Sequence, residues 1–258
     1  MSALATARRL SIVVPGIVAL LAWQFLSGPV VPKLYVSTPV DVARRLAELF
    51  SSGSVYPDLW TTGRELLIGY AIGAVAGIVC GYALGRLHAA ARILEPYITA
   101  AYGIPLVTLA PLFIIWFGIG IWSKVTICAI LVFFLVFFTV FGGVRSVSRE
   151  LVDVARILGA SQSQLTRHVY LHASMPYIFA GLRNALPFAV IGVTVGEFIS
   201  AFQGLGLYIN RSSTTLDPAG VFAGIVIFLA LILLAKALLG TLERRVLRWN
   251  RGQAARGS

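Results

Sequence analysis

The stretch VTICAILVFFLVFFTVF, residues 125–141, contains no charged residue and decides the class of fold. A run of this length without polar periodicity is typical of a helix that crosses a bilayer, and it is too long for an ordinary buried strand. A second run, 221–239, has the same character and holds Lys236 as its one charge. These two segments predict an all-α membrane protein.

The composition of the whole chain supports this class. Of the 258 residues, 58% are hydrophobic and only 12% are charged, with a mean hydropathy of +0.88. A soluble domain of this size needs a charged, mixed surface, which these residues cannot supply. We predict one transmembrane domain over residues 1–258 with six membrane helices of roughly 20 residues each. Their expected ranges are 10–27, 64–85, 95–117, 124–143, 176–199 and 219–241.

The net charge of +11 would suggest nucleic acid in a soluble protein, but no nucleic-acid-binding motif is present. The basic residues instead lie between apolar segments, as in the cytoplasmic loops of membrane proteins. With the N-terminus inside, 13 of the 21 Lys and Arg residues fall on the cytoplasmic side and six on the outer side. We therefore predict both termini in the cytoplasm, an uncleaved first helix and no nucleic-acid partner. The outer set is Lys33, Arg44, Arg45, Arg64, Lys124 and Arg211.

Three connections complete the predicted layout. Residues 28–63 form an external connection with a short amphipathic helix over 40–50, which we place along the membrane surface. Residues 145–174 form the longest cytoplasmic loop, and its first part, 149–165, has the composition of a helix lying on the cytoplasmic face. Residues 243–258 form a basic cytoplasmic tail.

Five glycines repeat at a spacing of four within the second predicted helix, so they lie on one stripe. Small residues at this spacing let another helix approach closely in lipid. The pattern leaves open whether the partner is in the same chain, in another subunit, or a helix that slides during gating. The five are Gly69, Gly73, Gly77, Gly81 and Gly85.

Two further features point to the translocation pathway. Pro105, within Gly103-Ile104-Pro105, and Pro111 interrupt the third predicted helix, and such breaks occur where a helix lines a cavity or meets a neighbour. Glu197 lies in the fifth predicted helix, where a carboxylate must face protein or water. For Glu197 we consider a pathway or gating role and, as the alternative, a hydrogen-bonded group at the outer interface.

The cytoplasmic loop resembles a known family. Permeases of ABC importers carry a loop of the form E-A-A-x3-G-x9-I-x-L-P, and here Asp153-Val154-Ala155 is followed by Gly159, Val169 and Leu171. Asp153 replaces the usual Glu, and His172 stands where the family has Pro. Further similar pieces are Thr38-Pro39, the run 111–120, Glu197 and Gly204-Leu205-Gly206. Taken together, the chain is similar to the nitrate/sulfonate/taurine branch of these permeases.

This resemblance implies the type I ABC importer permease fold and a division of labour. Two permease copies, identical in most of this branch, form the pathway in the bacterial inner membrane. Two ATPase subunits bind ATP and Mg, and a solute-binding protein delivers a small solute, such as a sulfonate, taurine, nitrate or an aromatic carboxylate. This chain lacks G-x4-G-K-[ST], so we predict no bound cofactor, no catalytic residue and no enzyme activity of its own. The predicted contacts of the coupling helix with the ATPase are Asp153, Ala155, Arg156 and Gly159.

Two other functions can be weighed from the residues. His168 and His172 have the i, i+4 spacing of metal ligands, but H-E-x-x-H is absent and no third ligand stands out, so we predict neither a metal site nor a membrane enzyme. An ion-gradient-driven carrier or a channel is the main alternative. Such carriers usually hold more acidic groups within their helices, and the sequence indicates only Glu197.

Overall fold

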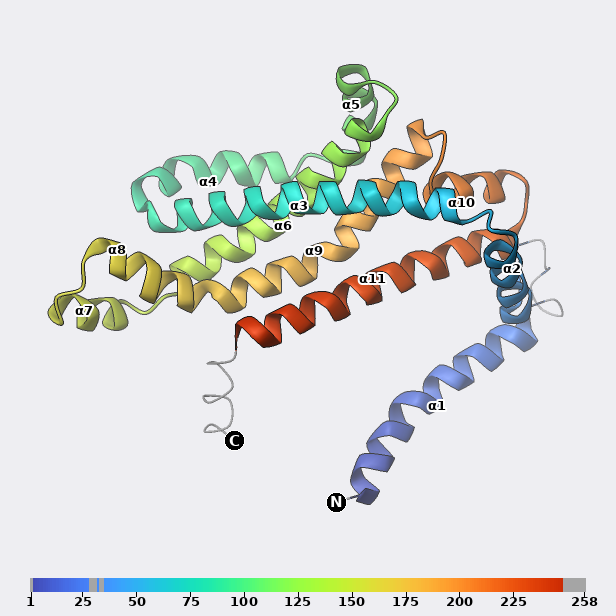
Figure 1. The fold of residues 1–258 in the computed structure, drawn as a ribbon, viewed down its shortest axis with the longest axis horizontal. Coiled ribbons are helices and arrows are strands. Elements are labelled where there is room, and N and C mark those ends of the chain that lie inside the picture. Colours follow the sequence, from blue (N-terminus) through green and yellow to red (C-terminus); the bar gives the residue numbers. More distant parts are fainter. Residues whose placement is uncertain (1, 28–31, 33–34, 248–258) are drawn as a thin grey trace. The chain divides into compact units, whose positions relative to one another are not determined.

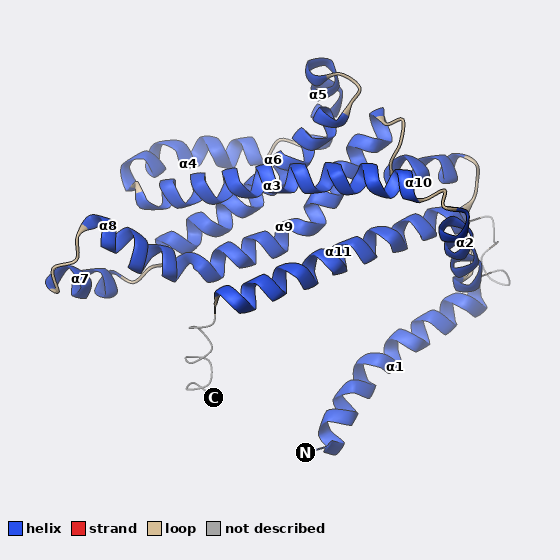
Figure 2. Ribbon diagram, in the orientation of Figure 1, coloured by secondary structure: helices blue, strands red, loops and turns tan. Residues whose placement is uncertain are grey.

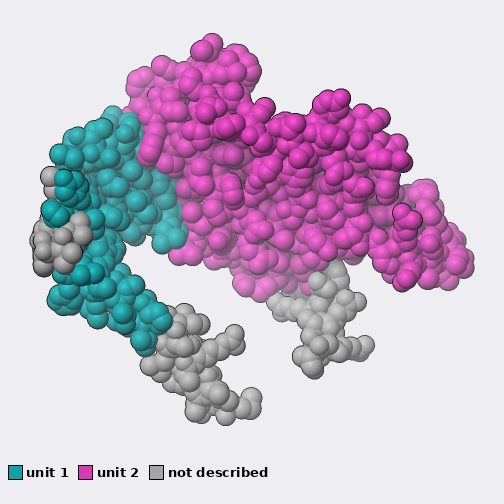
Figure 3. Space-filling model, turned by 180° about the vertical axis from the view of Figure 1, so that it is seen from behind, with its two compact units in different colours: residues 1–61, 203–229 teal, residues 62–202, 230–258 magenta. Residues whose placement is uncertain are grey.

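The computed structural model describes residues 2–27, 32 and 35–247. Every regular element in these ranges is a helix, which confirms the all-α prediction (Figure 2). Most of the irregular segment 28–34 and the tail beyond residue 247 lie outside the described residues. The chain divides into two compact units, which Figure 3 colours separately. One holds residues 1–61 and 203–229, and the other holds residues 62–202 and 230–258.

The first unit contains α1 (Ser2–Leu26), α2 (Pro39–Ser52) and α10 (Leu205–Thr214). The helix α2 begins where Thr38 accepts a hydrogen bond from the Asp41 N–H and Pro39 occupies the first turn, a common N-terminal arrangement. Its Val42 and Leu49 are buried. Its charged side holds Arg45, whose guanidinium lies 2.7 Å from the Asp217 carboxylate just before α11 (Pro218–Val246). The helix predicted at 40–50 is therefore present, with one or two more residues at each end.

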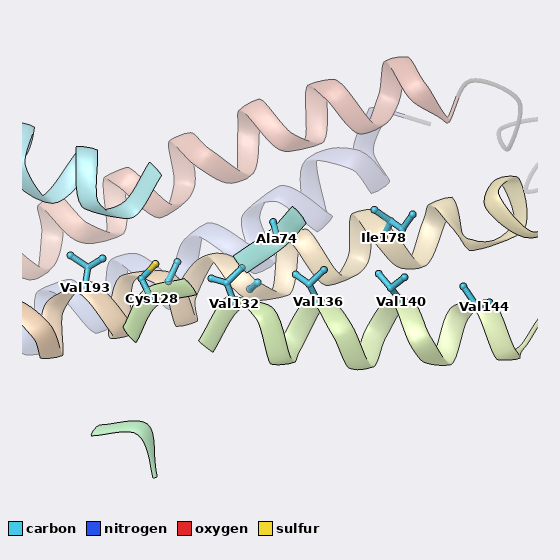
Figure 4. Packing of buried hydrophobic residues seen from close by; sticks show 10 residues of the cluster. Ala74, Cys128, Val132, Val136, Val140, Val144, Ile178 and Val193 are labelled. Carbon is cyan, nitrogen blue, oxygen red and sulfur yellow. The ribbon is translucent and has the colours of Figure 1, made fainter. Parts of the chain in front are cut away.

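The second unit is built around α6 (Ile121–Arg145), which packs between α3 (Tyr56–Arg86) and α9 (Leu171–Ser200). Val132, Val136, Val140 and Val144 follow one another along one side of α6 at the i, i+4 spacing of a helix face (Figure 4). Ala74 of α3 and Ile178 and Val193 of α9 join the same buried cluster. The uncharged run 125–141 is thus the centre of this unit.

Within the described residues, four helices are long and apolar enough to cross a membrane, and a fifth span results if one bent pair is counted as a single crossing (Figure 1). The four lie within 56–86, 121–145, 162–200 and 218–246. Within α1, the apolar stretch Val14–Leu26 is shorter than these four helices. The prediction of six crossings is thus supported for four or five of them. The helix predicted over 64–85 begins earlier in the structure, since α3 starts at Tyr56.

The third predicted helix, 95–117, is wrong as a single element. The structure has α4 (His88–Tyr102), a 3-10 turn η1 (Leu106–Leu109) and α5 (Ala110–Phe117), with an angle of 77° across the break. Pro105 has no N–H to continue the helix, and its ring disfavours helical geometry at the preceding residue. The chain therefore turns at residues 103–105, and Pro111 occupies the first turn of the new helix.

The predicted cytoplasmic helix over 149–165 is also interrupted. The structure has α7 (Arg149–Ile157), the single turn α8 (Gln162–Gln164) and a π-helical turn η2 (Leu165–Tyr170) that continues into α9. Gly159 adopts φ +84°, a left-handed conformation that ends a helix. Ser161 and Gln164 then form a capping box that starts the next turn. Elsewhere in this unit, Arg183 of α9 pairs with Glu243 of α11 at 2.6 Å.

Candidate functional site

A buried ionic network joins α3, α6 and α9 near one end of these helices. The Lys124 ammonium donates to a Glu65 carboxylate oxygen at 2.8 Å, and the Thr62 hydroxyl donates to Glu197 Oε1 at 2.6 Å. Glu65 is 1% exposed, Glu197 0% and Lys124 4%. Transferring such charges out of water costs several kcal/mol per ion, and a close partner recovers much of this. The Lys124–Glu65 pair therefore joins α6 to α3, and the Thr62–Glu197 hydrogen bond joins α3 to α9.

Small residues on α9 make room for this network. A side chain at Gly196 would meet the Lys124 Cγ at 2.7 Å, and one at Gly192 would meet the Cys128 Cα at 2.8 Å. The two glycines let α6 approach the α9 backbone closely, so the Lys124 stem lies flat against α9 and its ammonium reaches α3. Glu65 Oε2 has no hydrogen-bond partner among the described residues.

The sequence indicated one of the three buried charged residues of this network and missed the other two. Glu197 was expected to face protein or water, and it is buried against α3, where it accepts a hydrogen bond from Thr62. Lys124 was assigned to the outer side from the distribution of basic residues. It is instead buried in an ion pair with Glu65, so its charge takes part in helix packing. Glu65 was not considered, and the statement that only Glu197 is well placed inside the helices is therefore wrong. The i, i+3 pair Thr62 and Glu65 on one face of an apolar helix is the pattern that would have found it.

The glycine stripe of α3 packs against α6 of the same chain. A side-chain carbon at Gly69 would meet Cys128 Cβ at 2.7 Å, and one at Gly77 would meet the Phe133 carbonyl oxygen at 2.9 Å. Gly73, Gly81 and Gly85 are equally close to Ala129, Phe137 and Val144. All five glycines thus let the α3 backbone contact α6, and the two helices form one tightly packed pair.

The loop at the other end of the bundle presents two different faces of α7. The outward face carries apolar side chains that are strongly exposed, with Ile157 at 85% and Leu158 at 81%. Leu151 and Val154 extend this face, since they precede Leu158 by seven and four residues. The opposite face holds Val152, Asp153 and Arg156, and Val152 is buried. Asp153 and Arg156 pair at 3.5 Å, and both side chains are more than half exposed.

A defined turn fixes the end of α7. The Ala160 N–H donates to the Ala155 carbonyl at 3.0 Å, and the Gly159 N–H donates to the Arg156 carbonyl at 2.9 Å. This is the hydrogen-bond pattern of a Schellman motif, which requires a left-handed residue at the Gly159 position. Space around Gly159 is open, so the constraint on this residue comes from its backbone and not from neighbours.

The same loop is fastened to α3 by three contacts that the sequence did not reveal. The Tyr82 hydroxyl donates to the Thr166 carbonyl at 2.8 Å, and Arg86 donates to the Thr166 hydroxyl at 3.1 Å. The Arg86 guanidinium also lies 3.7 Å from the centre of the Tyr170 ring, a cation–π geometry. Glu65 and Arg86 are 21 residues apart on α3, about 30 Å along the helix. This helix therefore connects the loop to the ionic network.

The remaining predicted residues lie apart from these groups. Pro105 and Pro111 are exposed and belong to the break between α4 and α5. His168 and His172 stack with ring centres 6.1 Å apart. Within the described ranges, no three His, Cys, Asp or Glu side chains come together as a metal site would need.

Comparisons with known proteins agree on one kind of molecule. A family model described as the binding-protein-dependent transport system inner membrane component matches residues 73–248. The chain is 32% identical to the formylaminopyrimidine transport permease protein of Halalkalibacterium halodurans, over 90% of this chain and 92% of that protein. It is also 32% identical to a putative aliphatic sulfonates transport permease protein of Bacillus subtilis, over 88% and 83%.

A solved structure shows the same fold. The chain resembles a chain in a structure of inward-facing conformations of the MetNI methionine ABC transporter, with a TM-score of 0.63 and 19% identity. The match covers 73% of this chain and 94% of that one.

Proposed function

Because the chain belongs to the family of binding-protein-dependent transport system inner membrane components and is thus an ABC transporter permease, we propose how it takes part in import. Two copies of the chain form the pathway for a small organic solute, two ATPase subunits drive it, and a solute-binding protein delivers the solute. The membrane-spanning helices are α1, α3, the α4–α5 pair, α6, α9 and α11, with both termini in the cytoplasm. The helix α2 lies along the outer membrane surface.

The observation that carries this proposal is the outward face of α7. A nine-residue helix in a polar loop exposes a continuous row of large apolar side chains, which costs free energy in water unless a partner covers them. A groove on the ATPase subunit is the partner that the family resemblance implies. Helix-in-groove binding uses this spacing of apolar residues on one helix face. The Schellman turn at Gly159 sets the length of the helix that docks.

The inner contacts provide a route for movement. When the ATPase subunits close, α7 moves with them, and the loop pulls on α3 through Tyr82 and Arg86. Because the glycine stripe packs α3 against the α6 backbone, the two helices move together. The ionic network then transmits this movement to α9 at the opposite end, which is the role we propose for Glu197. In this proposal the exposed pair Asp153 and Arg156 flanks the apolar face of α7, and Pro105 and Pro111 give the pathway-lining pair its bend.

The solute is proposed as a class only. One relative is named for a formylaminopyrimidine and another for aliphatic sulfonates, so both a heteroaromatic compound and a small sulfonate are candidates. We propose sulfonates first, because the resemblance of the chain is to the nitrate/sulfonate/taurine branch. The positive charge of the chain gives no further support, since membrane topology accounts for it equally well.

Purification with the native ATPase subunit tests the coupling. We expect the ATPase to be recovered in equal amount with wild-type permease and to hydrolyse ATP. Gly159→Val should reduce this recovery, because a β-branched residue at φ +84° distorts the turn that ends α7. Gly159→Asn is the matched control, since Asn tolerates the left-handed conformation. Equal recovery with both variants would contradict the proposed role of the turn.

A further inference from the structure

A cavity of about 650 Å³ lies behind the inner face of α7, and the coupling proposal leaves it without a role. Three arginines line it: Arg145 from the end of α6, and Arg149 and Arg156 from α7. His88, at the start of α4, adds a polar ring. Asp153 is the one acidic residue among the described lining residues, so the cavity is positive overall.

The arginines of this cavity are available to an anion. Arg149 makes no ion pair among the described residues. Arg145 pairs with Glu95 at 2.9 Å and Arg156 with Asp153 at 3.5 Å, but each of these side chains is between about a third and two thirds exposed. Exposed pairs of this kind contribute little to stability, so a phosphate oxygen can replace either carboxylate at little cost. Guanidinium groups bind phosphate with two parallel hydrogen bonds, which favours this replacement.

The position of the cavity points to a lipid. It lies at the ends of α4 and α6, where these helices leave the apolar span and where the proposed orientation places the cytoplasmic headgroups. Val144 and Val152 form an apolar part of its wall beside the arginines. A phospholipid headgroup combines a phosphate with an apolar glycerol ester region, and basic pockets at this depth bind anionic lipids. A free phosphate would use only the arginines.

We propose that this cavity binds the headgroup of an anionic phospholipid and that the bound phosphate joins α7 to the end of α6. The proposal uses the membrane orientation proposed above but not the ATPase docking. Its lipid would sit on the inner face of α7, so the apolar outer face remains free for a protein partner. The chemical class is a phosphodiester with a net negative charge, such as phosphatidylglycerol.

Native mass spectrometry of the full-length chain, co-purified with its ATPase, tests this proposal. Phosphatidylglycerol and phosphatidylcholine are offered in equal amounts, and the retained lipid is counted. We expect phosphatidylglycerol to be retained preferentially and Arg149→Gln to lower its retention about tenfold, the effect of losing one charge-assisted contact. Arg92→Gln is the matched control, because Arg92 is exposed on α4 and does not line the cavity. Arg149→Lys, which keeps the charge but not the paired geometry, should fall between the two.

Several results would overturn the proposal. Equal retention of both lipids, or an equal loss for Arg149→Gln and Arg92→Gln, would show that no specific site exists. Displacement of phosphatidylglycerol by millimolar inorganic phosphate would identify a free anion as the ligand instead. Loss of the lipid only when the ATPase is bound would assign the cavity to the protein interface. Counting the lipid on the permease without its ATPase distinguishes that case. The same count can be made if the ATPase fails to co-purify, so failure of the coupling proposal does not decide the lipid proposal.

Discussion

The same substitution, Gly to Ala, should have opposite effects at two positions of α3. At Gly63 an added methyl group meets nothing within 4 Å, while at Gly73 it would overlap the Ala129 carbonyl oxygen and lie 2.8 Å from Val132 Cβ. Favourable carbon–carbon contacts are at about 3.5–4.0 Å, so α3 and α6 must separate by roughly 0.7 Å or more at Gly73.

The magnitudes follow from this geometry. Replacing Gly by Ala within a helix contributes up to about 1 kcal/mol of stability where space is open, as at Gly63. Overpacking a close contact costs about 1–3 kcal/mol, and at Gly73 the contact is with backbone, which cannot rotate away. We therefore expect Gly63→Ala to be neutral or stabilising and Gly73→Ala to be destabilising, with a difference of about 1–4 kcal/mol between them.

A thiol-reactive dye gives a direct measurement of this difference. Cys128 is fully buried beneath Gly69, whereas Cys80 is exposed. In a Cys80→Ser background, labelling of Cys128 during heating therefore reports unfolding of the α3–α6 contact. Gly73→Ala should lower the midpoint of labelling and Gly63→Ala should leave it unchanged or raise it. Equal midpoints for the two variants, or a higher midpoint for Gly73→Ala, would refute the packing of α3 on α6.

Three further predictions concern the polar contacts. Lys124→Met should destabilise the chain by about 3–5 kcal/mol in the same assay, because it leaves the buried Glu65 carboxylate without its ion-pair partner. Adding Glu65→Leu should recover most of the lost stability, and no recovery would contradict the pairing. Arg86→Gln should leave ATP hydrolysis intact but lower the solute taken up per ATP hydrolysed, since it removes the contacts with Thr166 and Tyr170. An unchanged ratio of uptake to hydrolysis would show that Arg86 has no role in coupling. Glu197→Gln should alter uptake with assembly intact, and unchanged uptake would leave Glu197 with a structural role only.

The sequence predicted the elements whose residues carry their own pattern. The uncharged run at 125–141 is the central helix α6, and the glycine spacing on α3 indicated a close helix contact before any partner was known. The turn at Gly159, inside the helix predicted over 149–165, follows from the backbone freedom of glycine, which adopts the left-handed conformation there. In each case the structure follows from a local feature, namely the length of the apolar run, the spacing of the glycines or the backbone freedom of a single glycine.

What the sequence did not reveal depends on tertiary contacts. Lys124 and Glu65 are 59 residues apart, so nothing local shows that they meet, and each alone looks like a charge at a helix end. The angle of the α4–α5 break is likewise set by packing, although Pro105 indicated its place. The contact of Arg86 with Tyr170 depends on a π-helical turn that no residue pattern predicts.

The central claim is that this chain carries solute with energy from ATP. The most direct measurement is uptake of a labelled sulfonate into liposomes that contain the permease and its ATPase, with the binding protein supplied outside. We predict uptake that requires ATP inside the liposomes and persists when ionophores collapse the proton and sodium gradients. Uptake driven by an ion gradient without ATP, or by the permease alone, would contradict the claim and identify a carrier or a channel.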